Sequence, residues 1–294
     1  MRKLSRYLLL ITIVTMSLAT GCIKENMDDC MGKVTLRFRY VGDGTTDIFP
    51  EKIEHVTMYV YSKADGSLVD EIRYDDKALD AYQGAHIALF PGRYGIVCWG
   101  NALEETTISE GEKIAANGHY DNSTIHTNDP LYYGTIDIEV PETLVEKNYT
   151  CDFVCSHVKF RVRIEGFDDP VTNVPALELT QLASFTDFDN IPSEEEQCSY
   201  YPVLDADPND ATSYTAAFNT LRFKDDNDIT LRIHANESRV IAHEFSLADF
   251  LDENNIAVEG VHEVTIPILI RFSPIGVEII DWDTAPVIPD FDKD

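Results

Sequence analysis

The chain has 294 residues, of which 52 are acidic and 23 basic, so its formal net charge is −29. This length suits one large domain or two of ordinary size, and a hydrophobic content of 44% is enough to build real cores. So acidic a surface repels nucleic acid and anionic lipid headgroups, which makes both poor partners. We therefore expect no nucleic-acid partner.

The first residues have the features of a secretory signal. Three basic residues among the first six precede an apolar run over residues 7–20. This run is shorter than the roughly 20 apolar residues that a spanning helix needs, and a basic start with a short apolar region is typical of a signal peptide. The run closes on small residues directly before Cys22. We expect residues 1–21 to be removed.

The residues "ATGC", which end at Cys22, resemble the lipobox of bacterial lipoproteins, with Ala19 where leucine is usual. A cysteine with two or three acyl chains stays on a membrane because each buried CH₂ contributes about 0.8 kcal/mol. We expect the mature protein to begin at a lipidated Cys22 and residues 22–32 to form a polar tether. The acidic residues of this tether resemble surface-export signals of lipoproteins in Gram-negative anaerobes. The alternative is an ordinary signal peptide that happens to precede a cysteine.

Six cysteines occur, and five remain if Cys22 carries lipid, so at least one thiol is free or bonded to another molecule. An exported protein meets oxidising surroundings, which favour disulfides. Cys30 and Cys98 share the parity of the apolar faces of their expected strands. They are the best candidates for a disulfide, provided that their Cα atoms lie within about 7 Å. Cys155 has the opposite parity and is the candidate free thiol.

Apolar and polar residues alternate along most of the chain, which indicates half-buried strands. A first cluster of such segments includes VTLRFRYV (34–41), HVTMYVYS (55–62), AHIALF (85–90) and GTIDIEV (134–140). A second cluster includes SHVKFRVRIEG (156–166), VTIPILIRF (264–272) and GVEIIDW (276–282). Many short strands bounded by Gly, Pro, Asn or Asp are typical of antiparallel β-sandwiches.

Helical patterns are sparse. Ser246 is a plausible N-cap for a helix that starts at Leu247, and residues 104–116 have room for a helical turn or two. The segment 141–150 is the expected seam between the two clusters. We therefore predict an all-β chain of two tandem antiparallel β-sandwich domains. The expected N-terminal domain covers 33–148, the C-terminal domain covers 149–284, and a tail covers 285–294.

Several stretches together resemble the FimB-type fimbrial anchor proteins of type V pili. They are GCIKENMDDC, VTLRFRYV, VTMYVYSKADGSLV, FPGRYGIVCWGNA, LYYG and VEIIDW, in this order. The resemblance implies two transthyretin-like domains in an outer-membrane lipoprotein that is exposed at the cell surface. It also implies a place at the base of a fimbrium, with fimbrillin shaft subunits as partners. Because strand 34–41 closely follows the lipid site, its removal would remove the tether. We expect the anchor to keep this strand and to contact the shaft through the C-terminal domain or the tail.

The sequence contains no set of residues whose types and spacing are specific for a catalytic site. The motifs HExxH and GxSxG and a glycine-rich phosphate loop are all absent. We expect no enzymatic activity, metal or cofactor. Trp99 and Trp282 are more consistent with packing than with a sugar platform. The alternative function is a surface glycan-binding lipoprotein of a nutrient-uptake system, which requires an exposed flat row of aromatic side chains.

Overall fold

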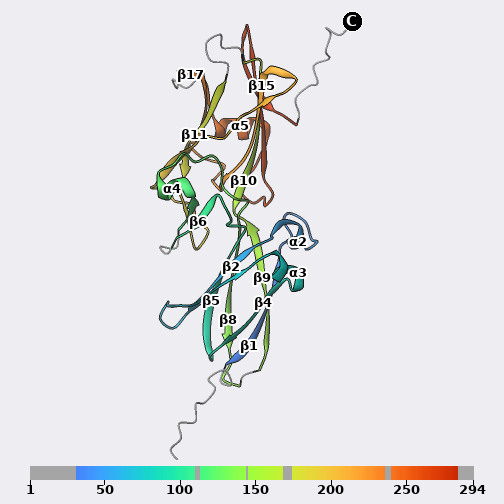
Figure 1. Ribbon diagram of the computed structural model, residues 1–294, viewed down its shortest axis with the longest axis vertical. Coiled ribbons are helices and arrows are strands. Elements are labelled where there is room, and N and C mark those ends of the chain that lie inside the picture. Colours follow the sequence, from blue (N-terminus) through green and yellow to red (C-terminus); the bar gives the residue numbers. More distant parts are fainter. Residues whose placement is uncertain (1–30, 110–112, 144, 168–173, 236–239, 284–294) are drawn as a thin grey trace, which may run out of the picture.

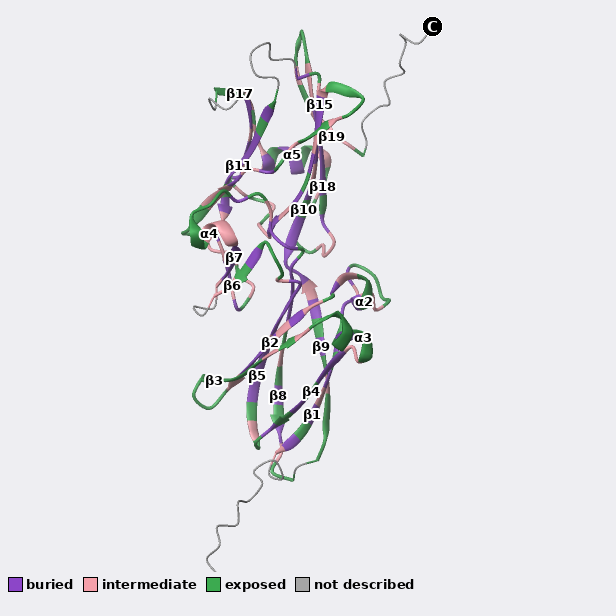
Figure 2. Cartoon of the chain, viewed as in Figure 1, coloured by how far each residue is buried: buried purple, intermediate pink, exposed green. Residues whose placement is uncertain are grey.

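The structure is a computed structural model that describes residues 31–109, 113–143, 145–167, 174–235 and 240–283. These residues form mostly β-strands with a few short helices, so the prediction of an all-β chain is confirmed. Two β-domains follow one another along the long axis of the molecule (Figure 1). Buried residues run through both domains and through the region where they meet (Figure 2).

The N-terminal domain is built from seven strands that form one strongly folded sheet. These strands are β1 (Gly32–Arg39), β2 (Val56–Ser62), β3 (Leu68–Tyr74), β4 (Gly84–Leu89), β5 (Gly92–Gly100), β8 (Tyr132–Val140) and β9 (Lys147–Cys155). Their spatial order is β3-β2-β5-β8-β9-β1-β4. The last residues of β9 pair antiparallel with β8, and its first residues pair parallel with β1. Strand β9 therefore carries the sheet from one layer of a sandwich to the other.

Strand β1 lies inside this sheet, between β9 and β4, and fills the core from one face. Its apolar residues Val34, Leu36 and Phe38 are at most 1% exposed. Burying each such side chain stabilises the fold by roughly 1.5 to 3 kcal/mol. The approach of β4 depends on Gly84, because a Cβ there would lie 1.9 Å from the carbonyl oxygen of Leu36. Two short helices, α2 (Phe49–Lys52) and α3 (Asp76–Ala81), lie between the strands in sequence.

The C-terminal domain is a sandwich of two sheets. One has the order β14-β15-β10-β18-β19 and the other β13-β11-β16-β17. The bounds are β10 (His157–Glu165), β11 (Pro175–Ala183), β13 (Gln197–Tyr200), β14 (Asp205–Asp207), β15 (Asp210–Leu221), β16 (Thr230–Ala235), β17 (Val240–Ser246), β18 (Thr265–Ser273) and β19 (Gly276–Asp281). Helix α5 (Leu247–Asn254) contributes three buried side chains to the core between them. Its N-cap is Ser246, as the sequence predicts, with the side chain accepting from the N–H of Asp249 at 3.2 Å.

The structure differs from the sequence prediction in two details of this architecture. The sandwiches are not purely antiparallel, because β1 pairs parallel with β9 and β10 pairs parallel with β18. The predicted boundary between 148 and 149 falls inside β9, and the chain passes from the first domain to the second at Ser156. The start of β9 is exposed and polar, so its sequence resembles that of a linker. In the structure it pairs with β1.

The connection from β5 to β8 leaves the N-terminal domain and packs on the C-terminal one. It forms β6 (Thr106–Ile108), β7 (Lys113–Ala116) and α4 (Asn117–Asp121), so the helical turns expected over 104–116 are wrong. Strand β7 pairs on its other side with β12 (Thr186–Asp187) of the C-terminal domain. A partner so distant in sequence leaves no local pattern, which explains the error.

Candidate functional site: the junction between the domains

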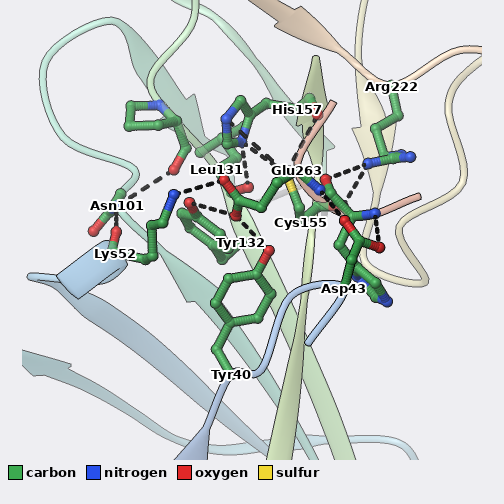
Figure 3. A network of polar contacts seen from close by, with 12 residues as sticks. Tyr40, Asp43, Lys52, Asn101, Leu131, Tyr132, Cys155, His157, Arg222 and Glu263 are labelled. Carbon is green, nitrogen blue, oxygen red and sulfur yellow. Dashed lines mark hydrogen bonds and ion pairs between the residues drawn. The ribbon is translucent and has the colours of Figure 1, made fainter. Parts of the chain in front are cut away.

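The two domains meet through a group of polar side chains, which we call the polar cluster: Tyr40, Asp43, Lys52, Tyr132 and Glu263 (Figure 3). Glu263 precedes β18 in the C-terminal domain, and the other four belong to the N-terminal domain. The Glu263 carboxylate lies 2.7 Å from the Lys52 ammonium. It also accepts a hydrogen bond from the Tyr40 hydroxyl and a longer one, at 3.4 Å, from the Tyr132 hydroxyl. One carboxylate thus receives three donors from the opposite domain.

The surroundings of Glu263 favour its ionised form. Burial alone raises the pKa of a carboxyl, but the hydrogen bonds from Lys52 and Tyr40 outweigh burial and hold the pKa of Glu263 below its ordinary value. Burial and the hydrogen bond to Glu263 raise the pKa of Tyr40 well above its usual range. Burial likewise raises the pKa of Tyr132. Both tyrosines therefore stay protonated and act as donors to the carboxylate.

Two further side chains hold the loop that presents Glu263. Asp43 accepts the backbone N–H of His262 at 2.9 Å and that of Glu263 at 3.1 Å. Burial acts to raise the pKa of Asp43, but these two donors lower it below its ordinary value. From the other side, the Arg222 guanidinium donates to four backbone carbonyls, those of Cys155, Val258, Val261 and His262. The loop is therefore tied to both domains.

Apolar side chains form a second contact between the domains, the aromatic cluster of Tyr59, Tyr61, Trp99, Tyr133 and Phe188. Phe188 comes from the C-terminal domain, directly after β12. Its ring lies 4.9 Å from that of Tyr59 and 6.3 Å from that of Tyr61, both in edge-on geometry. Edge-to-face pairs of this kind add about 0.5 to 1.5 kcal/mol beyond the area that they bury. Phe188 is only 8% exposed, so it is effectively a core residue shared by two domains.

Hydrogen bonds to backbone groups complete the junction. The Asp129 carboxylate accepts the N–H groups of Leu103, Glu105 and Thr106, which shapes the start of the β5–β8 connection. Asn128 then donates its backbone N–H to the carbonyl of Asn219 in β15 at 3.0 Å. The domains are therefore joined by strand pairing, ion pairing and apolar packing as well as by the covalent link at Ser156.

A cysteine and a histidine lie side by side at this junction, but their state does not suit nucleophilic chemistry. The Cys155 sulfur is 3.2 Å from Nδ1 of His157. Burial raises the pKa of the Cys155 thiol to about 11 and lowers the pKa of His157. The active form of such a pair is a thiolate beside a protonated imidazole. Here both groups are neutral, and they are 3% and 7% exposed.

The residues singled out in the sequence are spread over the molecule. Cys22 and Cys30 lie outside the described residues, so lipidation and the Cys30–Cys98 disulfide stay predictions. Cys98 carries a free thiol that is fully buried. Trp99 is fully buried, as the packing interpretation predicts, and the Trp282 ring lies 4.8 Å from the Arg161 guanidinium. The polar cluster has no signature in the sequence, because isolated residues distant along the chain supply it.

Two broader features of the described residues bear on function. Their His, Cys, Asp and Glu side chains form no group of three or more that could hold a metal ion. Within the same part of the chain, every helix is too short or too polar to cross a membrane.

Comparisons with known proteins give a consistent picture. A family model described as fimbrillin-A associated anchor proteins Mfa1 and Mfa2 matches residues 27–285. No curated protein sequence matches the chain.

Solved structures share the fold at low sequence identity. The fimbrial anchor protein Mfa2 of Porphyromonas gingivalis has a TM-score of 0.65 and 17% identity, over 86% of this chain and 98% of that chain. A suspected polysaccharide-binding protein of Bacteroides thetaiotaomicron has a TM-score of 0.67 and 16% identity, over 85% and 96%. A suspected adhesin of the same organism has a TM-score of 0.65 and 17% identity, over 86% and 97%.

Proposed function

The chain belongs to the family of fimbrillin-A associated anchor proteins Mfa1 and Mfa2, and we propose that it is the structural anchor of a fimbria. In this proposal a lipid on Cys22 tethers the protein to the outer membrane, at the cell surface. The C-terminal domain holds the first fimbrillin shaft subunit by strand pairing. The role is mechanical, and it needs no enzymatic activity and no cofactor.

The observation that carries the proposal is the position of β1. This strand follows the lipid site closely, and it is paired with β9 on one side and β4 on the other. Its inward side chains occupy the core almost without exposure. Because β1 is an interior strand, a pull on the tether acts on many hydrogen bonds at once. This arrangement suits a retained N-terminus that bears load.

The arrangement of the domains supports the same role. The start of β1 lies at the lower end of the molecule and the C-terminal domain at the upper end (Figure 1). The ion pair between Lys52 and Glu263 and the packing of Phe188 join the domains at the junction. A load applied at one end therefore passes to the other through paired strands and buried side chains.

The C-terminal domain offers edges at which a shaft subunit could pair. Strands β17 and β19 each form one edge of a sheet, and an edge strand presents unpaired backbone groups to a partner chain. In β17, Val240 is 60% exposed and Ile241 is 46% exposed. The tail after β19 is a second candidate for this contact, and residues 284–294 lie outside the described part of the chain.

The glycan-binding alternative has less support. It requires a row of exposed aromatic side chains. Among the described residues, the large exposed aromatic side chains are Phe90 and Tyr120, which are 40% and 39% exposed. Phe90 lies in the turn between β4 and β5 and Tyr120 lies in α4. These two elements belong to different parts of the fold, so the two rings do not make a platform.

A fractionation experiment tests the tether. Replacing Cys22 with Ser should move the protein out of the outer-membrane fraction or leave it unprocessed. The matched control is Cys198→Ser, which should stay with the membrane because Cys198 lies on β13 of the C-terminal domain. A correctly cleaved Cys22→Ser protein that stays membrane-bound to the same extent contradicts the tether.

A truncation tests the shaft contact. Deleting residues 284–294 should reduce the amount of shaft that remains on the cell if the tail takes part in the contact. If the cells keep the same amount of shaft, the tail takes no part in the contact. The contact is then assigned to the sheet edges of the C-terminal domain.

A further inference from the structure

Two buried cysteines face each other inside the N-terminal sandwich. Cys98 lies on β5 and Cys151 on β9. Both are 0% exposed, both carry free thiols and both belong to the same core cluster. Burial, and after it the neighbouring Cys151 side chain, raises the pKa of the Cys98 thiol well above its usual range. The fold therefore brings together two thiols that are far apart in sequence.

Gly134 explains how the two sulfurs come so close. This residue lies on β8, between the strands that carry the cysteines, and it is the direct partner of Cys98 in the β5–β8 ladder. A Cβ on Gly134 would lie only 3.0 Å from the Cys151 sulfur. Such a separation is tighter than ordinary contacts allow. The missing side chain leaves the space into which the Cys151 sulfur projects toward Cys98.

We propose that Cys98 and Cys151 form a disulfide that joins β5 to β9 when the chain folds in an oxidising compartment. A bond between inward-facing cysteines of two packed strands is a known way to fasten a β-sandwich. The bond requires the two sulfurs to reach a separation of about 2.05 Å, with the two Cα atoms within about 7 Å of each other. This inference goes beyond the anchoring role and gives Cys98 a different partner from Cys30.

The chemistry is thiol–disulfide exchange with a disulfide-bonded oxidant, either a small molecule such as oxidised glutathione or a protein. The Cys98 thiolate attacks one sulfur of the oxidant, which forms a mixed disulfide and releases one thiolate. The Cys151 thiolate then attacks the Cys98 sulfur and releases the second. Two protons and two electrons leave the chain, and the oxidant becomes two thiols. Both cysteines are closed off in the folded state, so the exchange takes place during folding.

The other described cysteines have different surroundings. The Cys155 sulfur contacts Nδ1 of His157 at 3.2 Å, and the Cys198 sulfur contacts the carbonyl of Ala183 at 3.7 Å. Cys155 and Cys151 lie four residues apart on one strand, about 13 Å at the usual rise, so they cannot bond to each other. Cys155 and Cys198 therefore serve as internal controls within the same chain.

Differential labelling tests the proposal. Full-length protein is taken from membranes directly into denaturant with a light alkylating reagent, then reduced, and then treated with a heavy reagent. Peptide mass spectrometry should find the heavy label on Cys98 and Cys151 and the light label on Cys155 and Cys198. A digest without reduction should contain one cross-linked pair of peptides that carries Cys98 and Cys151.

The outcome does not depend on whether the protein anchors a fimbria. Unfolding the same chain and refolding it with reduced and oxidised glutathione should give the same cross-link. A Cys151→Ala chain should carry the light label on Cys98, whereas Cys155→Ala should keep the cross-link. Light label on both Cys98 and Cys151 in the unaltered chain overturns the proposal, and so does a cross-link from Cys98 to Cys30.

Discussion

The Lys52 ammonium lies 2.7 Å from the Glu263 carboxylate, and this ion pair joins two domains that are far apart in sequence. Lys52 ends a short helix of the N-terminal domain, and Glu263 precedes β18 of the C-terminal domain. Their side chains are 36% and 31% exposed, so the pair is neither fully solvated nor fully buried. Its contribution to the free energy of unfolding should therefore lie between that of a surface ion pair and that of a buried one.

Replacing Glu263 with Gln should lower the free energy of unfolding by about 1 to 2 kcal/mol, because the carboxylate loses its charge while Lys52 and Tyr40 stay in place. The matched control is Glu194→Gln. Glu194 pairs with Lys224 at the same 2.7 Å, but its side chain is 78% exposed. The control should change the free energy of unfolding much less, because solvent screens so exposed a pair. Urea unfolding of the unaltered protein and the two variants measures the difference. Equal losses of stability in both variants would show that the junction pair contributes no more than an exposed pair.

Acid should weaken the junction through Asp43 and Glu263. Both have folded-state pKa values below the ordinary values of 3.8 and 4.5. A carboxyl of this kind stabilises the fold above its unfolded pKa, and this contribution is lost as the pH falls through its folded pKa. The urea concentration at the midpoint of unfolding should therefore decrease as the pH is lowered below about 4.5. The drop should be smaller in the Asp43→Asn, Glu263→Gln double variant, and an identical pH profile in both proteins would contradict this assignment.

Phe188→Ala should remove the main apolar contact between the domains. Because the ring is almost fully buried against Tyr59 and Tyr61, its loss should cost about 3 kcal/mol. Calorimetry should also show the two domains separating into distinct transitions. The control, Phe90→Ala, removes a ring that is 40% exposed and should change stability by about 0.5 kcal/mol or less. A single unchanged transition in the Phe188 variant would argue against coupling through this ring.

Gly84→Ala should disrupt the pairing of β4 with β1. The new Cβ would lie 1.9 Å from the Leu36 carbonyl oxygen, so the strands must separate. We expect the free energy of unfolding to fall by about 3 kcal/mol and hydrogen exchange at β1 amides to become faster. Gly44→Ala is the control, because its Cβ would lie 3.4 Å from the nearest atom, the Val41 carbonyl oxygen. Normal protection of β1 in the Gly84 variant would contradict the role given to this close approach.

The sequence predicts well those elements whose signal is local. Strands β1 and β10 alternate cleanly because one face of each packs on a core, and Ser246 caps its helix through its own side chain. The predictions fail where the partner is distant. The start of β9 is polar and exposed, so only its pairing with β1 shows that it belongs to the N-terminal sheet. Strand β7 pairs with a strand of the other domain.

The junction itself is beyond sequence reasoning for a related reason. Glu263 is one of 52 acidic residues and sits in a loop, so no spacing marks it. Its partners Tyr40, Lys52 and Tyr132 come from three separate elements. The contact between Cys98 and Cys151 is hidden in the same way, because it depends on Gly134 in the strand between them.

The central claim is that the anchor keeps β1 and its lipid tether in the assembled fimbria. The N-terminal sequence of the protein recovered from assembled fimbriae tests this claim most directly. We predict that it begins at an acylated Cys22, with strand β1 intact. A protein that begins beyond Val41 would have lost both the tether and the strand that fills its core, and would contradict the account.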